Sequence, residues 1–122
     1  MAEITRKELV LALLGVHEDH KPRLSGVDLS GLNLSYLNLS SADLGAANLE
    51  GANLEGTNLN RAFLGGANLQ RANLRGAYLR DAQLIGTDLR GADLTDARIT
   101  GTMVRGCNVE GAILPGSFTQ LA

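Results

Sequence analysis

Residues 51–79 read GANLEGTNLNRAFLGGANLQRANLRGAYL, and every fifth residue from Leu54 to Leu79 is a leucine. The spacing extends both ways, because all 19 positions taken every five residues from Leu24 to Leu114 are aliphatic and sixteen are leucine. The 18 positions that lie two residues before these centres, taken every five residues from 27 to 112, hold eleven alanines and seven other small or apolar residues. Asn or Asp directly precedes twelve of 18 centres, and glycine is the commonest residue two positions after a centre. The repeating unit is therefore A-(N/D)-L-x-G.

A period of five matches neither the 3.6-residue period of a helix nor the two-residue period of a strand. Each unit has two apolar positions and three polar or small ones, so two residues of every five are expected to face inward. The backbone must then turn a corner in every unit, and Gly and Asn/Asp tolerate turn dihedrals. The pattern therefore predicts a regular coil with a core of stacked aliphatic side chains.

These repeats resemble the pentapeptide-repeat family, and the resemblance covers about three quarters of the chain. It implies an all-β fold, a right-handed four-sided parallel β-helix with four pentapeptides per coil. The number of sides comes from this resemblance and not from the period. Residues 24–114 would make about 4.5 coils, and at ~4.8 Å per coil the stack would be about 22 Å tall.

Composition excludes several classes of protein. The 122 residues are 44% hydrophobic but only 3% aromatic, and the net charge of −2 offers no general field for nucleic acid or membranes. The single cysteine excludes an internal disulfide framework and a cysteine-based zinc site. No stretch is long enough to span a bilayer. The apolar run at residues 9–16 follows Arg6 and Lys7, as the h-region of a signal peptide would, but it is short and no A-x-A cleavage pattern comes before His17. We therefore expect a cytoplasmic protein.

Both ends of the coil need cover, since an open end exposes core leucines and unpaired backbone groups. Residues 1–23 are expected to supply a cap and a connector. Thr5 and Glu8 have the spacing of a capping box, Ile4 and Leu9 fit a hydrophobic staple, and an amphipathic helix is predicted over residues 6–14. The tail, residues 115–122, either folds over the last coil through Phe118 and Leu121 or pairs with a second molecule. The protein is therefore expected to be a monomer or a homodimer formed through a coil end.

No catalytic, cofactor-binding or metal-binding residues are predicted. His17 and His20 lie in the sequence HEDH, which could bind a metal but lacks further fixed ligands, so a solvated connector is the simpler interpretation. Cys107 occupies an inward position otherwise held by Ala or Thr, which favours a core residue over a nucleophile. Phosphate-binding loops and nucleophile elbows are absent from the sequence. We therefore do not expect an enzyme.

A 20-residue coil would place residues i and i+20 in one column. Three opposite-charge pairs then arise, and they are expected to link adjacent coils: Glu55 with Arg75, Arg61 with Asp81, and Arg90 with Glu110. Arg71, Arg80, Arg98 and Arg105 have no partner in their columns, although Arg98 would lie over Tyr78 in a cation–π stack.

Outward apolar residues accompany these arginines, and the combination resembles the composition of a protein interface. The candidate interaction surface contains Phe63, Arg71, Tyr78, Arg80, Ile85, Arg98, Met103 and Arg105.

Two classes of function follow. The first is a non-enzymatic structural or protein-interaction module that presents side chains on a rigid coil to a protein partner that the sequence does not name. The alternative is implied by the resemblance, since some pentapeptide-repeat proteins mimic duplex DNA, bind DNA gyrase and confer quinolone resistance. Those members are longer, acidic rods, whereas residues 61–105 here carry seven Arg against four Asp. Direct binding of nucleic acid is disfavoured because the arginines are dispersed and partly neutralised.

Overall fold

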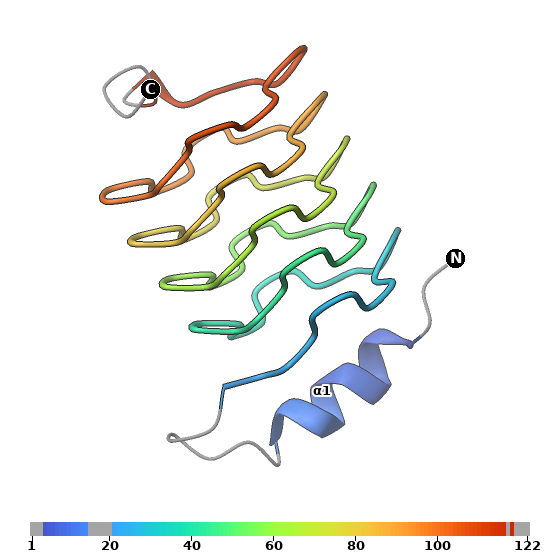
Figure 1. Ribbon diagram of the computed structural model, residues 1–122. Helices are drawn as coiled ribbons and strands as arrows, with labels where there is room; N and C mark the ends of the chain where they lie inside the picture. The colour runs from blue at the N-terminus through green and yellow to red at the C-terminus, as the bar shows by residue number, and fades with distance from the viewer. Residues whose placement is uncertain (1–3, 15–20, 117, 119–122) are drawn as a thin grey trace.

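The computed structural model describes residues 4–14, 21–116 and 118. Residues 21–116 wind into a stack of coils, and the helix α1 (Arg6–Leu14) lies beside the first coil (Figure 1). Parallel β-bridges connect the residue just before each aliphatic centre with the residue 20 positions later, from Arg23–Asp43 to Asp93–Ile113. One coil therefore takes 20 residues, which confirms four pentapeptides per coil. The strands of the described part are these single bridged residues, one for each side of each coil.

The bridged residues form four columns, which define the four sides of the coil. The first side carries Arg23, Asp43, Phe63, Gln83 and Met103; the second Asp28, Asn48, Asn68, Asp88 and Asn108; the third Asn33, Asn53, Asn73, Asp93 and Ile113; and the fourth Asn38, Asn58, Tyr78 and Arg98. Each column is a parallel ladder with backbone bonds in both directions. The N–H of Asn48, for example, donates to the carbonyl of Val27 at 3.0 Å, and the Asn48 carbonyl accepts from Leu29 at 2.7 Å.

Corners between the sides are tight turns closed by a backbone hydrogen bond. In the first, the N–H of Val27 donates to the carbonyl of Leu24 at 3.2 Å, and the pattern repeats every five residues to Ala112. The second central residue of each turn has a positive φ, as in a type II turn, which explains the frequent glycine. Most Asn and Asp residues of the repeats lie in the middle of the sides, and only Asp81 and Asp96 occupy the positive-φ corner position, so the expectation that Asn and Asp serve as corner residues holds for those two alone.

The core is the stack of aliphatic centres. The centres from Leu29 to Leu94 are at most 1% exposed, and most of the alanines two residues before them are also buried. Three inward threonines are satisfied by carbonyls of the coil below; Thr87, for example, donates from its hydroxyl to Leu64 at 2.7 Å. Burial decreases at the C-terminal end, where Val104, Val109 and Leu114 are half-buried. The inward pattern predicted from the sequence is therefore confirmed.

The helix α1 begins with the predicted capping box. The N–H of Thr5 donates to Glu8 Oε1 at 3.0 Å, and the N–H of Glu8 donates to Thr5 Oγ1 at 3.1 Å. Leu9 is 1% exposed and belongs to the core cluster, while Arg6 donates to the backbone carbonyls of Asn33 at 2.6 Å and Ser35 at 3.0 Å. The helix is not clearly amphipathic, because its apolar residues follow one another without a break.

At the opposite end, Phe118 is buried against the core cluster and its N–H donates to the carbonyl of Pro115 at 3.0 Å. Leu121 lies outside the described residues. Within the described ranges, no helix has the length and apolar character needed to cross a membrane.

Candidate functional site

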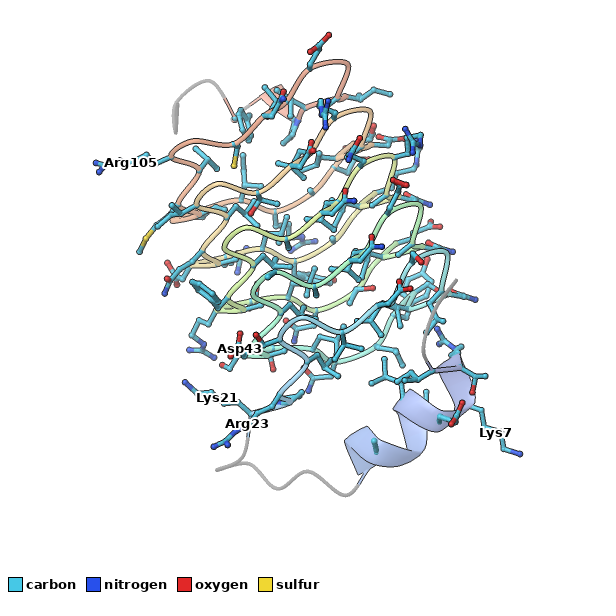
Figure 2. All side chains as sticks on the ribbon, turned by 45° about the vertical axis from the view of Figure 1, so that its right-hand side comes forward. Lys7, Lys21, Arg23, Asp43 and Arg105 are labelled. Carbon is cyan, nitrogen blue, oxygen red and sulfur yellow. The ribbon has the colours of Figure 1, made fainter. Side chains whose placement is uncertain are left out.

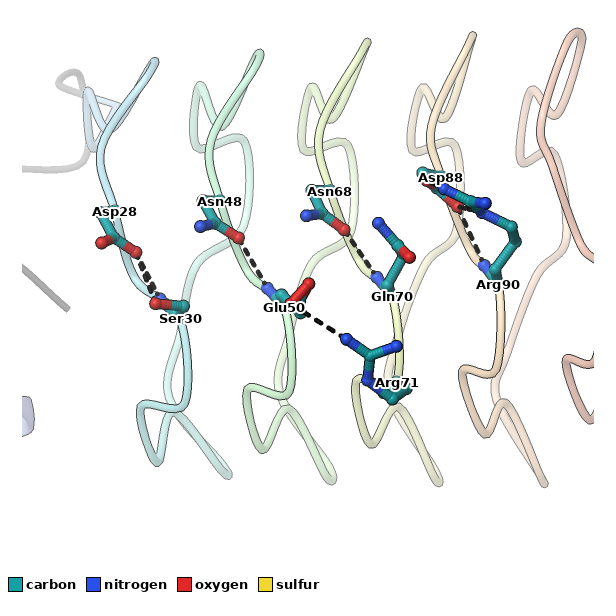
Figure 3. A network of polar contacts seen from close by, with 9 residues as sticks. All are labelled: Asp28, Ser30, Asn48, Glu50, Asn68, Gln70, Arg71, Asp88 and Arg90. Carbon is teal, nitrogen blue, oxygen red and sulfur yellow. Dashed lines mark hydrogen bonds and ion pairs between the residues drawn. The ribbon is translucent and has the colours of Figure 1, made fainter. Parts of the chain in front are cut away.

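Most of the polar outer surface has a structural task. The side-chain Oδ1 of Asn or Asp in the middle of a side accepts a hydrogen bond from the N–H two residues later, as Figure 3 shows along the second side. The distance from Asn68 Oδ1 to the Gln70 nitrogen is 3.0 Å. At Asp88 the side-chain bonds from Arg90 are the main reason why the pKa of the carboxyl lies below its ordinary value. Such residues satisfy corner N–H groups, so they carry little information about a partner.

The first side departs from this pattern on three consecutive coils. Phe63, Gln83 and Met103 replace Asn or Asp, and none of them bonds to the N–H two residues later. The corner N–H groups of Gly65, Ile85 and Arg105 consequently have no acceptor within the described residues. At Tyr78 on the fourth side a similar replacement is compensated, because Asn60 Oδ1 of the coil below accepts from the N–H of Arg80 at 2.9 Å.

Exposed apolar side chains accompany the unpaired donors. Phe63, Ile85 and Met103 are 41%, 44% and 50% exposed. The Phe63 ring lies against the backbone of Gly45 and Gly65, where an added Cβ would come within 2.7 Å and 2.6 Å of ring carbons. We call Phe63, Ile85 and Met103 the apolar strip. Arg23 and Asp43 belong to the first side, and Figure 2 shows them, with Arg105, in the left part of the molecule.

The fourth side contributes an aromatic and a basic residue. The guanidinium carbon of Arg98 lies 5.0 Å from the centroid of the Tyr78 ring, so the predicted cation–π contact is confirmed. Arg80 follows Tyr78 at the corner between the fourth and first sides. Seven of the eight candidate residues therefore lie on two adjacent sides and their corners. Arg71 does not, because it occupies the corner between the second and third sides.

The predicted vertical ion pairs are not the ones that form. Ion pairs within the described ranges join Arg71 to Glu50 at 3.0 Å, Arg75 to Asp93 at 3.1 Å and Arg90 to Asp88 at 2.7 Å. Arginine side chains are long, so they reach diagonally to the neighbouring column or back along their own side. Arg71, expected to lack a partner in its column, is therefore paired diagonally.

Cys107 is a half-buried core residue. Its thiol donates to the carbonyl of Leu84 at 2.9 Å, and burial raises the pKa of the thiol above its ordinary value. The thiolate is thus disfavoured, in agreement with the interpretation as a core residue. His17 and His20 lie outside the described residues. Elsewhere, the part that the structure describes brings together no group of three His, Cys, Asp or Glu side chains that could hold a metal ion.

Two exposed side chains escaped sequence reasoning. Tyr36 and Ile113 are 72% and 57% exposed. Ile113 had an available signal, since it breaks the Asn/Asp pattern in the middle of the third side. Tyr36 also had one, because it occupies a corner position where glycine is usual. Its φ of 62° is an uncommon backbone conformation for an aromatic residue.

Comparison with known proteins agrees with this geometry. The chain matches the family described as pentapeptide repeats, in eight copies, over residues 23–61, 47–82 and 77–116. It is similar to a pentapeptide repeat protein of the thylakoid lumen of Arabidopsis thaliana, with 33% identity and a TM-score of 0.73, over 82% of this chain and 73% of that one. A search among curated proteins found no match.

Two further solved structures are similar over part of their length. Rfr23, a pentapeptide repeat protein of the cyanobacterium Cyanothece 51142, has 41% identity and a TM-score of 0.40 over 71% of this chain and 63% of that one. QnrB1, a plasmid-mediated fluoroquinolone resistance protein, has 20% identity and a TM-score of 0.49 over 74% of this chain and 59% of that one. The family match and the similarity to the thylakoid-lumen protein imply that the four-sided β-helix is right-handed. With a matching repeat in every coil from residue 23 to residue 116, the chain belongs to the pentapeptide-repeat family.

Proposed function

We propose that this protein is a non-enzymatic interaction module that binds a protein partner through its first and fourth sides. The observation that carries the proposal is the run of three coils on which Phe63, Gln83 and Met103 replace the Asn or Asp that would satisfy the next corner. The replacements leave exposed apolar surface and unpaired N–H donors side by side. Contact with another polypeptide would stabilise both features, because the partner can cover the apolar strip and supply carbonyl acceptors for the N–H groups.

Charge supports a particular kind of partner. Arg80 and Arg105 lie at the corners of the first side and Arg98 on the fourth side, and none of them forms an ion pair with a described residue. A protein surface with an apolar centre and acidic residues at its rim would complement this arrangement. Arginine is enriched at protein interfaces, whereas scattered surface ion pairs contribute little to folding stability. The arginines are therefore better explained by recognition than by stability.

The test is a combined variant that restores the repeat pattern, namely Phe63→Asn, Ile85→Ser and Met103→Asn. Because Asn is the usual residue in the middle of a side, the coil should remain folded, which circular dichroism checks. Ile113→Asn makes the same kind of change on the third side and serves as the matched control. Affinity capture from the native host, followed by mass spectrometry, should show a partner that is lost with the combined variant and retained with the control. Equal capture by both variants would remove the proposal.

The alternative, a DNA mimic that binds gyrase, is placed second because the middle of the chain is basic. Residues 61–105 carry seven Arg and four Asp. A mimic of duplex DNA needs a dense negative surface. A supercoiling assay with purified gyrase separates the two proposals: inhibition of supercoiling or protection from quinolones would replace the first by the second.

We further propose that α1 protects the first coil from pairing with other chains, through Leu9 in the core and Arg6 on the carbonyls of the third side. For the C-terminal end we propose that Phe118 covers the last coil within one chain. The second proposal is that this coil end forms a homodimer. Light scattering distinguishes a monomer from a dimer, and a dimer that survives dilution would support the second.

A further inference from the structure

A pocket of about 280 Å³ opens at the corner between the third and fourth sides, away from the apolar strip. Its floor is formed by Gly56 and Gly76 on consecutive coils. The Tyr36 ring lies against Gly56, so closely that a Cβ there would clash with it. An added Cβ at Gly76 would meet nothing within 4 Å. The space over Gly76 therefore exists because this corner has no side chain, while the next coil carries Asp96 and the corner two coils below carries Tyr36, whose ring covers Gly56.

The walls of the pocket combine aromatic rings and carboxylates. Tyr36 and Tyr78 provide the rings, and Glu55 and Asp96 provide the carboxylates. Neither carboxylate forms an ion pair with any residue in the described ranges. Arg75 also lines the pocket, but its guanidinium is bound to Asp93 at 3.1 Å. Among the charged residues that line the pocket, those without an ion pair in the described ranges are therefore the two acidic ones.

One ring of this pocket already holds a guanidinium within the structure, because Arg98 stacks over Tyr78 at 5.0 Å. Tyr36 is 72% exposed, and the ring contacts known for it are with Gly56, so much of its surface is available for a similar contact. Ring faces attract cations, and guanidinium is the cation that most often stacks on them in proteins. Carboxylates add charge-assisted hydrogen bonds to its N–H groups.

We propose that this pocket binds an arginine side chain from a segment of a partner protein, with the guanidinium between Tyr36 and the carboxylates of Glu55 and Asp96. Free arginine fits less well, since its α-carboxylate would meet the same two carboxylates while Arg75 is engaged with Asp93. An arginine within a peptide carries no such carboxylate. The proposal does not depend on the apolar strip, which lies on the first side.

The experiment titrates the full chain with acetyl-Gly-Arg-Gly-amide and follows backbone amide shifts by NMR. We expect saturable shifts at Gly76 and Thr95. The same peptide with citrulline, a neutral isostere of arginine, should bind about tenfold more weakly, and free L-arginine should also bind more weakly than the peptide. Equal binding of the citrulline peptide would overturn the charge argument. Tighter binding of free arginine would overturn the assignment to a protein segment.

A pair of variants tests the location of binding. Gly76→Asn fills the pocket, and its φ of 63° is one that Asn tolerates. Gly86→Asn is the matched control, because Gly86 has a φ of 69° and equally open space at another corner. Gly76→Asn should abolish the shifts while Gly86→Asn preserves them. Binding that survives Gly76→Asn, or is lost equally in both folded variants, would refute the proposal.

Discussion

Two substitutions in the middle of a side should change the free energy of unfolding in opposite directions, one by removing a side-chain methylene and the other by adding one. Gln83→Asn shortens the side chain so that its Oδ1 can accept from the N–H of Ile85, which has no acceptor in the described part of the chain. Asn68→Gln removes the equivalent bond of 3.0 Å to the N–H of Gln70. Both sites lie on a regular coil, so the two variants are close to being reverse experiments.

The magnitude follows from the exposure of the donor. A net intramolecular hydrogen bond contributes about 0.5–1.5 kcal/mol, and Ile85 lies at an exposed corner where its N–H is accessible to solvent. We therefore expect Gln83→Asn to raise the free energy of unfolding by about 0.5–1 kcal/mol. Asn68→Gln should lower it by about the same amount.

Urea unfolding measures both changes, with the midpoint shifting and the m-value constant. Amide exchange adds a local reading: the N–H of Ile85 should become protected in Gln83→Asn, and that of Gln70 should lose protection in Asn68→Gln. Gln70→Asn is the control, since its neighbours Arg71 and Ala72 already donate to backbone carbonyls. If both main variants shift the midpoint in the same direction, or if exchange at Ile85 does not slow, the reasoning about unpaired corner donors is refuted.

Three other predictions concern the core, the helix and acid. Thr87→Val keeps the shape of the side chain but removes the hydrogen bond from its hydroxyl to the Leu64 carbonyl, which still accepts from the N–H of Ala67. Urea unfolding should therefore show that the free energy of unfolding falls by about 1 kcal/mol. Leu9→Ala should lower the free energy of unfolding by about 2–4 kcal/mol, because Leu9 is buried. Amide exchange should increase first in the coil next to α1, and a uniform increase along the stack would argue against a local cap. Asp88 has a lowered pKa in the folded state because of Arg90, so its stabilising contribution is present at neutral pH and lost as the pH falls through that lowered pKa. Asp88→Asn retains an Oδ1 acceptor but does not titrate, and its midpoint should vary less below about pH 4 than that of the wild type.

The interior could be predicted from the sequence because its rule is one-dimensional. A residue such as Leu64 is inward by its place in the five-residue count, and its burial needs no further knowledge. The number of sides could not be obtained in this way, since coils with three, four or five sides all satisfy the same count. It became an expectation through the family resemblance, and the bridge between Phe63 and Gln83 confirms it.

The exterior was less predictable because side-chain reach decides which neighbours meet. Columns were assigned correctly, as the stack of Arg98 on Tyr78 shows. Arg75, however, forms its ion pair with Asp93 and not with Glu55, because a flexible arginine can cross to the adjacent column. The pocket was missed for a related reason. It depends on an absent side chain at Gly76 and on the direction of the Tyr36 ring, and a repeat count contains neither.

The 20-residue coil has a consequence for how such a chain tolerates insertions and deletions. A change of five residues leaves every later leucine inside, because the interior accepts any whole number of units. Each later outward residue nevertheless moves to the adjacent side, so five residues inserted between Phe63 and Tyr78 would part Phe63 from Ile85 while Tyr78 and Arg98, both downstream of the insertion, stayed together. Only a change of 20 residues preserves the surface as well as the interior. Length changes in this architecture can thus rearrange recognition surfaces while the fold stays intact.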